Sequence, residues 1–152
     1  QIKKLWFSNS KMVMSFRYKT IKRPDGTLVK TPSIPIQLNG KERFETIALV
    51  DSGADISAVP LSIAEILGLD LTKEKTPSYG IGGKVDSIET NMNIIVEKGH
   101  EHYSLKIPVK VILGNYDFPV LLGRLGFFDE FIISFDQSSE KIILKKKSEN
   151  KF

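Results

Sequence analysis

Apolar and polar residues alternate along much of the chain, and short turn sequences interrupt the alternation. Met14, Phe16 and Tyr18 share one face of an early predicted strand. The same two-residue period recurs over residues 90–96 and 105–113. A period of two is typical of strands with one buried face, so the pattern predicts a mainly β protein.

Turn residues predict where these strands end. Asn39-Gly40 is a strong signal for a two-residue hairpin turn between strands over 34–38 and 43–50. Pro108 lies on the face of its strand opposite the apolar one, which predicts a sheet edge or a bulge there. A closing hairpin is predicted to join residues 132–135 to 141–144.

Only two short helices are predicted. Pro60 can begin one and Gly68 can end it. The other is predicted over residues 125–130. We therefore expect one domain over residues 12–146 that is mainly all-β. Residues 1–11 are expected to form an N-terminal extension and residues 147–152 a basic C-terminal tail.

Composition and charge narrow the classes of function that this chain can have. The 152 residues carry a net charge of +4 and no cysteine, which excludes disulfides, zinc–thiolate sites and thiol nucleophiles. Much of the positive charge lies at the two ends, without interleaved aromatic residues, so we expect no nucleic-acid partner. No apolar run is long enough to span a bilayer. We therefore expect no membrane association and a cytoplasmic protein.

The most informative motif is Asp51-Ser52-Gly53, which follows Ala48-Leu49-Val50. Residues 47–50 are predicted to form a strand that is buried on both faces. A buried charge without a partner is costly, so an acid at the end of such a strand indicates a functional cleft. Gly53 permits a sharp turn directly after the acid.

Two glycine-containing motifs follow. Gly80-Ile81-Gly82-Gly83 fits neither a Walker loop nor a dinucleotide fingerprint, and a mobile hairpin tip or an ordinary flexible loop explains it equally well. In Leu121-Leu122-Gly123-Arg124 an apolar strand is followed by a guanidinium suited to hold a carboxylate. Asp55 is its natural candidate partner. The alternative is that Arg124 is simply solvated.

Together the three motifs resemble the retropepsin-like aspartic proteases, over roughly residues 34–144. The resemblance implies an acid-protease β-barrel lobe, closed or partly open, with one or two short helices, active as a two-fold homodimer without a cofactor. Leu125 departs from the family, whose members often have Asp or Asn there. The stretch from Lys98 to Tyr103 and the first thirty-odd residues have no counterpart in the minimal retroviral form.

The resemblance also implies roles for individual residues. Asp51 would be the catalytic aspartate, Ser52 would brace the two active-site loops, and Gly53 would offer its carbonyl to the substrate backbone. Substrate binding would involve Asp55, Gly80, Ile81, Gly82 and Gly83, with Ile81 closing over the ligand. Structural support would come from Ala54, Gly123 and Arg124, and Arg124 would pair with Asp55 beneath the site.

Hydrolysis by carboxylates needs two of them, one to accept a proton from water and one to donate a proton to the scissile carbonyl. The chain has one suitable Asp, so the enzymatic interpretation requires a homodimer with a peptide or protein substrate. An alternative is a non-catalytic dimerising module that binds peptides. A third, weaker hypothesis is a structural β domain whose basic tail contacts nucleic acid. His100 and His102 lack a third ligand, so we expect no metal site.

Overall fold

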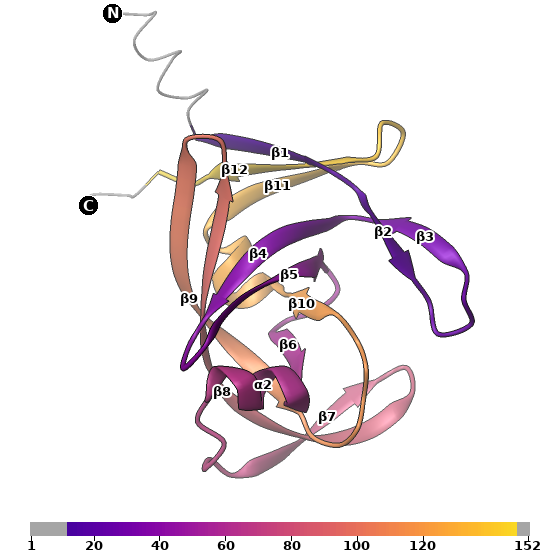
Figure 1. Ribbon diagram of the computed structural model, residues 1–152, viewed down its shortest axis with the longest axis vertical. Helices are drawn as coiled ribbons and strands as arrows, with labels where there is room; N and C mark the ends of the chain where they lie inside the picture. Colours follow the sequence, from indigo (N-terminus) through magenta and orange to yellow (C-terminus); the bar gives the residue numbers. More distant parts are fainter. Residues whose placement is uncertain (1–11, 149–152) are drawn as a thin grey trace, which may run out of the picture.

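The structure, a computed structural model, describes residues 12–148, and strands dominate this part of the chain (Figure 1). The predicted N-terminal extension and the last four residues of the predicted tail lie outside the described residues. In chain order the elements are β1 (Val13–Arg17), β2 (Lys19–Lys22), β3 (Leu28–Thr31), β4 (Ser33–Asn39), β5 (Arg43–Val50), β6 (Ser57–Pro60), α2 (Leu61–Leu67), β7 (Lys75–Gly80), β8 (Gly83–Lys98), β9 (Glu101–Ile112), β10 (Val120–Leu122), η1 (Arg124–Phe128), β11 (Phe131–Asp136) and β12 (Lys141–Lys146).

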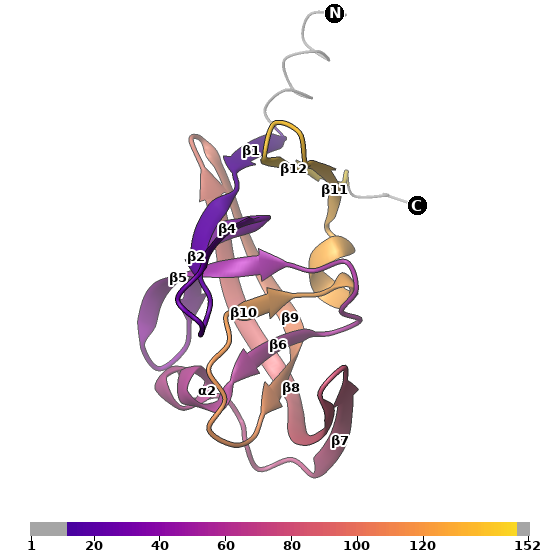
Figure 2. The ribbon, with the colours of Figure 1, turned by 90° about the vertical axis from the view of Figure 1, so that its right-hand side faces the viewer.

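The largest sheet has seven strands in the order β4-β5-β10-β6-β9-β8-β7, and β4 also pairs with β8. This extra pairing curls the sheet into a barrel-like shape (Figure 2). The short strand β10 lies parallel to β5 and antiparallel to β6. Because β5 and β10 are parallel neighbours, the residues that follow them meet at the same edge of the sheet.

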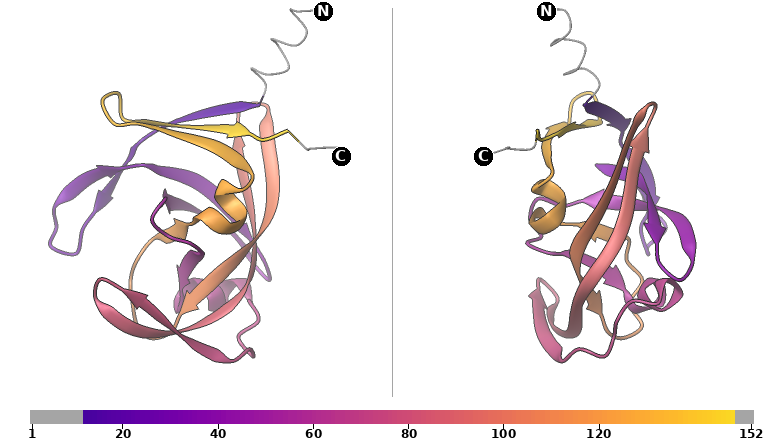
Figure 3. Two further views of the ribbon diagram at one scale, coloured as in Figure 1. Left: turned by 180° about the vertical axis from the view of Figure 1, so that it is seen from behind. Right: turned by 90° about the vertical axis from the view of Figure 1, so that its left-hand side faces the viewer.

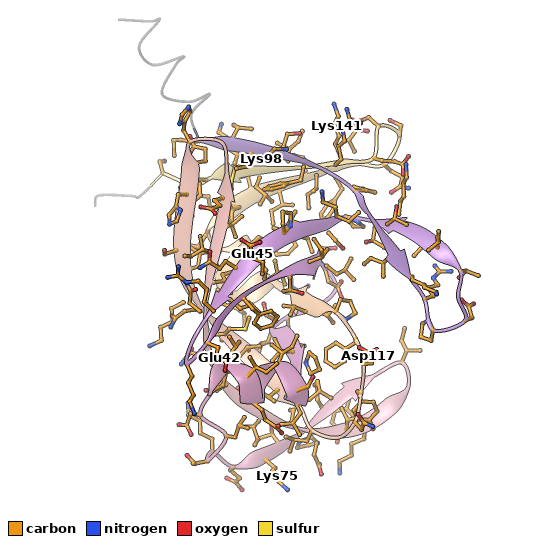
Figure 4. All side chains as sticks on the ribbon, in the orientation of Figure 1. Glu42, Glu45, Lys75, Lys98, Asp117 and Lys141 are labelled. Carbon is orange, nitrogen blue, oxygen red and sulfur yellow. The ribbon has the colours of Figure 1, made fainter. Side chains whose placement is uncertain are left out.

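The predicted alternation is confirmed in the core. Met14 and Phe16 are buried on one face of β1, and Tyr18, which directly follows the strand, is buried as well. Apart from Ser87, the buried residues of the long strands β8 and β9 also follow the two-residue period: they are Ile88, Thr90, Met92, Ile94, Val96, Ile107, Val109 and Val111. Charged side chains project outward instead, with Lys98 and Lys141 at one end of the molecule and Lys75 at the other (Figure 4).

The hairpin between β4 and β5 differs from the prediction. Asn39 pairs with Arg43, so the connecting loop has three residues rather than two. A Cβ at Gly40 would lie 2.2 Å from the Leu67 carbonyl oxygen, and the Lys41 amide donates to that oxygen over 2.8 Å. The loop therefore packs on the last turn of α2, and this contact selects a conformation that the local sequence does not reveal.

The first predicted helix is confirmed as α2. Pro60 precedes it in an extended conformation, and Gly68 ends it with a left-handed φ of 66°. The second is not a regular helix. Leu125 and Gly126 have non-helical dihedral angles inside η1, and Gly126 (φ 86°) packs directly on Pro108 and Ile107. Pro108 itself lies at an edge, as predicted, because the pairing of β9 with β6 begins at Val109.

A second, three-stranded sheet has the order β1-β12-β11 and contains the predicted closing hairpin. Seen from behind, it lies above the barrel, and η1 connects the two sheets (Figure 3). Strands β2 and β3 form a separate two-stranded ribbon. No helix in residues 12–148 is long and apolar enough to cross a bilayer.

Candidate active site

Asp51 lies where β5 ends, directly beside the end of β10. Its amide donates to the Leu122 carbonyl over 2.9 Å, and its Oδ1 accepts the Gly53 amide over 2.9 Å. Val50, which precedes Asp51, and Leu122, whose carbonyl accepts the Asp51 amide, are both buried. The backbone of the half-exposed acid is therefore anchored at the edge of the core. The prediction that residues 47–50 are buried on both faces was wrong, because Ile47 is exposed and Leu49 is half-buried.

Backbone hydrogen bonds tie the Asp51 turn to the turn after β10. The Arg124 amide donates to the Ala54 carbonyl over 2.9 Å, and the Leu125 amide donates to the Asp55 carbonyl over 2.8 Å. Two segments about 70 residues apart in the chain thus form one rigid unit. Ala54, Gly123 and Arg124 all lie in this unit, where the resemblance expects structural support.

Ser57 is a member of this unit that sequence reasoning missed. Its side chain is 0% exposed, and its Oγ accepts the amide of Gly123 over 2.9 Å. A hydroxyl inside the otherwise apolar segment 56–59 was the available signal, because a buried hydroxyl needs a hydrogen-bond partner. The structure shows that this partner is the glycine before Arg124.

Replacing Ser57 by alanine is expected to lower the free energy of unfolding by about 1–3 kcal/mol, because the buried Gly123 amide would lose its acceptor. Ser62→Ala is the matched control, since Ser62 is exposed on α2. Urea denaturation of both variants measures the difference. Equal stability of the two variants would contradict the importance of this bond.

The predicted ion pair between Asp55 and Arg124 is not among the salt bridges within residues 12–148. Asp55 Oδ1 instead accepts the Ile56 amide over 2.8 Å, and Arg124 Nη1 donates to the Ser52 carbonyl over 3.5 Å. Both side chains are exposed, and an exposed ion pair contributes little free energy to hold them together. The segments that carry the two residues are joined instead by the hydrogen bond from the Leu125 amide to the Asp55 carbonyl.

The glycine-rich segment forms the tip of a hairpin. β7 and β8 pair up to Gly80 and Gly83, which leaves Ile81 and Gly82 as a two-residue turn. Gly83 has a φ of 111°, a conformation that favours glycine. Ile81 is fully exposed and Tyr79 is mostly exposed, so the tip presents apolar side chains to the solvent. Figure 1 shows this hairpin projecting from the barrel.

The apolar side chains near the candidate site differ in accessibility. Val59 and Val120 are buried in the core and cannot contact a ligand, whereas Ile56 and Ile81 are accessible.

His102 pairs with Glu97 over 2.8 Å, and residues 12–148 contain no group of three side chains that could hold a metal ion. The side chains of this described part of the chain therefore give no support to a metal site.

Other aspartates with a turn-like sequence context have local structural roles. Asp25 Oδ1 accepts both the hydroxyl and the amide of Thr27 at the end of the β2–β3 ribbon, which lowers the pKa of Asp25. Asp136 accepts hydrogen bonds from Ser138 and Ser139 in the β11–β12 turn, which lowers its pKa. Neither aspartate lies in the unit that carries Asp51.

A solved structure with a TM-score above 0.5 shares this architecture. The chain is similar in structure to a retropepsin-like aspartic protease from Rickettsia conorii, with 24% identity, coverage of 88% of this chain and 92% of that one, and a TM-score of 0.54. It is also similar to the EIAV protease in complex with the inhibitor HBY-793, with 24% identity, 62% and 83% coverage and a TM-score of 0.41. No curated protein sequence matches the chain.

A family profile described as aspartyl protease matches residues 34–124. The match covers more than half of the chain and includes the Asp51 turn, the glycine-rich hairpin tip and the Gly123–Arg124 turn. The mainly β fold is that of the retropepsin-like proteases, as expected from the three motifs. The chain therefore belongs to the aspartyl protease family.

Proposed function

We propose that the chain is an aspartic endopeptidase that acts as a homodimer, with the Asp51 of each copy contributing one carboxyl group. The observation that carries this proposal is the fixed position of Asp51 between the ends of β5 and β10. The sequence contains no second Asp-Ser-Gly or Asp-Thr-Gly motif. A second carboxyl group therefore has to come from another copy of the chain.

In this mechanism, the ionised carboxylate accepts a proton from a water molecule while the protonated one donates to the scissile carbonyl. Two carboxyls in contact share one proton, and aspartic proteases are the standard example of this behaviour. Activity therefore falls at high pH, where the shared proton is lost, and at low pH, where both groups are protonated. We expect an optimum at acid to mildly acid pH.

Substrate would bind as an extended segment between the Asp51 pair and the hairpin tips. Gly53, Asp55 and residues 80–83 would contact it, with Ile81 closing over it. Ser52, which is exposed, would brace the two active-site loops across the dimer. Ala54, Gly123 and Arg124 would support the Asp51 turn. The proposed enzyme needs no cofactor, and we place it in the cytoplasm.

Cleavage of an unfolded polypeptide, measured over a range of pH and of protein concentration, tests this proposal. We expect a bell-shaped pH profile and a specific activity that falls on dilution as dimers dissociate. Cleavage with the same specific activity at every dilution would contradict the requirement for two copies. Tight peptide binding without any cleavage would instead support the non-catalytic peptide-binding module.

A further inference from the structure

The β2–β3 ribbon concentrates positive charge in a short segment. Residues 19–31 contain four basic residues and one acidic residue, which gives them a net charge of +3, whereas the whole chain of 152 residues has a net charge of +4. The basic residues are Lys19, Lys22, Arg23 and Lys30. Because like charges held this close together repel one another, such a segment favours an anionic partner.

The two basic residues nearest the tip of the ribbon have no counter-ion within residues 12–148. Lys22 and Arg23 are exposed, and neither takes part in a salt bridge of the described part of the chain. Asp25, the one acid of the ribbon, uses its Oδ1 locally: this oxygen accepts the amide of Thr27 over 2.9 Å and its hydroxyl over 2.7 Å. Lys22 and Arg23 are therefore accessible to a carboxylate from another molecule.

The exposed face of the ribbon combines this charge with apolar surface. Ile21 and Val29 lie opposite each other on the half-buried face. On the other face Lys22 lies opposite Leu28, which is 70% exposed. A cation beside an uncovered leucine fits a peptide segment with acidic and apolar side chains. Residues 19–31 include no aromatic side chain on which a base could stack, so a single-stranded nucleic acid fits the ribbon less well.

One strand of the ribbon is fixed directly beside Asp51. Pro32 joins β3 to β4, and its carbonyl accepts the amide of Val50, the residue before Asp51, over 3.0 Å. Ser33 is buried, and its Oγ is 2.8 Å from Oγ1 of Thr31, the last residue of β3. The base of the ribbon is thus part of the structure that positions the candidate catalytic acid.

The other strand is fixed to the β11–β12 turn. Tyr18, which precedes β2, is buried, and its amide donates to the Glu140 carbonyl over 2.8 Å. Lys30 of β3 lies 3.5 Å from a carboxylate oxygen of the same Glu140. A two-stranded ribbon by itself is marginally stable, so these attachments hold it in place. Figure 1 shows the ribbon and the β7–β8 hairpin projecting from the same side of the barrel, and Figure 2 looks onto that side.

We propose that the β2–β3 ribbon binds acidic residues of the substrate away from the cleaved bond, and so gives the enzyme a preference for acidic polypeptides. This inference rests on the proposed function, because it requires an extended polypeptide at Asp51. About 13 Å of extended strand separates Leu28 from Pro32 at the base of the ribbon. An extended substrate has the same rise per residue, so the acidic residues lie about four positions or more from the cleaved bond.

Two peptides of equal length test this preference, one with an acidic segment beside the cleaved sequence and one with glutamine in place of each acid. Their binding to Asp51→Asn protein, measured by fluorescence anisotropy, requires no cleavage. The double change Lys22→Gln and Arg23→Gln is expected to weaken binding of the acidic peptide by about three- to tenfold, because two exposed ion pairs are lost. Binding of the neutral peptide should not change.

The double change Lys41→Gln and Arg43→Gln provides the matched control. It also removes one lysine and one arginine, and both residues are exposed at the end of β5 remote from Asp51. The control should bind both peptides as the unaltered ribbon does. High salt should remove the preference for the acidic peptide, because it screens exposed charges. Equal weakening by the two double variants would overturn the proposal, since net charge alone would then explain it.

Cleavage of the same two peptides by protein that retains Asp51 separates the ribbon from the proposed activity. We expect a higher kcat/KM for the acidic peptide and a loss of this advantage in the Lys22→Gln, Arg23→Gln variant. Equal kcat/KM for both peptides would refute the ribbon's role and support the proposed function. Binding of the acidic peptide through the ribbon without cleavage would support the ribbon's role and refute the proposed function.

Two further results would overturn the proposal. The first is an equal loss of cleavage of both peptides in the Lys22→Gln, Arg23→Gln variant, because the ribbon would then act on the fold or on the dimer. The second is a single-stranded oligonucleotide, of the same charge as the acidic peptide, that binds the Asp51→Asn protein more tightly than the peptide and loses this binding in the ribbon variant.

Discussion

Replacing Asp51 by asparagine is expected to reduce peptide hydrolysis by about 10²–10⁴-fold, because the amide can neither accept nor donate the protons that the mechanism transfers. The turn itself should survive. Asp51 Oδ1 accepts the Gly53 amide over 2.9 Å, and the asparagine Oδ1 can accept the same bond. The loss of activity should therefore occur without a loss of fold, as initial cleavage rates and circular dichroism will show.

Asp86→Asn provides the matched control for this change. Asp86 is an exposed residue of β8 whose side chain makes no hydrogen bond or salt bridge within residues 12–148. Cleavage rates of the control should equal those of the wild type. If Asp51→Asn cleaves as fast as Asp86→Asn, Asp51 has no part in the chemistry.

Replacing Gly123 by alanine should give the largest loss of stability among the single changes considered. A Cβ there would lie 2.7 Å from the Ile56 carbonyl carbon and 2.9 Å from both the Ala54 oxygen and the Ser57 nitrogen. All three atoms belong to the backbone of the segment that leads from Asp51 to β6. That backbone must move, and we expect the free energy of unfolding to fall by about 1–3 kcal/mol or more.

Gly82→Ala separates this packing effect from the general cost of replacing a glycine. No heavy atom lies within 4 Å of a Cβ at Gly82, which is at the exposed hairpin tip. Its stability in urea should be within about 0.5 kcal/mol of the wild type. Equal midpoints for the two variants would show that the close approach at Gly123 is not required.

Features with a local signal could be predicted from the sequence. The two-residue period marked the buried faces of β1, β8 and β9, because alternation is a property of the strand itself. Pro60 and Gly68 marked the ends of α2 for the same reason. The three motifs of the candidate site were also visible, because each combines an apolar strand or a hairpin with an unusual polar or glycine turn.

Features that depend on long-range contacts could not be predicted. The loop after Asn39 is shaped by the Leu67 carbonyl, which is 28 residues from Asn39 in the sequence. η1 is distorted because Gly126 packs on Pro108 of a distant strand. The Asp55–Arg124 pair was expected from residue chemistry and family resemblance, whereas the structure joins these segments through backbone amides and Ser57. No local pattern encodes the choice between these contacts.

Mixing wild-type chains with Asp51→Asn chains tests most directly whether two copies supply one site. After unfolding and refolding together in equal amounts, about half of the dimers should be mixed and lack one of the two carboxyls. The account predicts that activity per wild-type chain then falls to about half, and that it approaches zero as the Asp51→Asn chain is added in excess. Activity per wild-type chain that stays constant at every ratio would contradict it, because each copy would then hydrolyse peptides by itself.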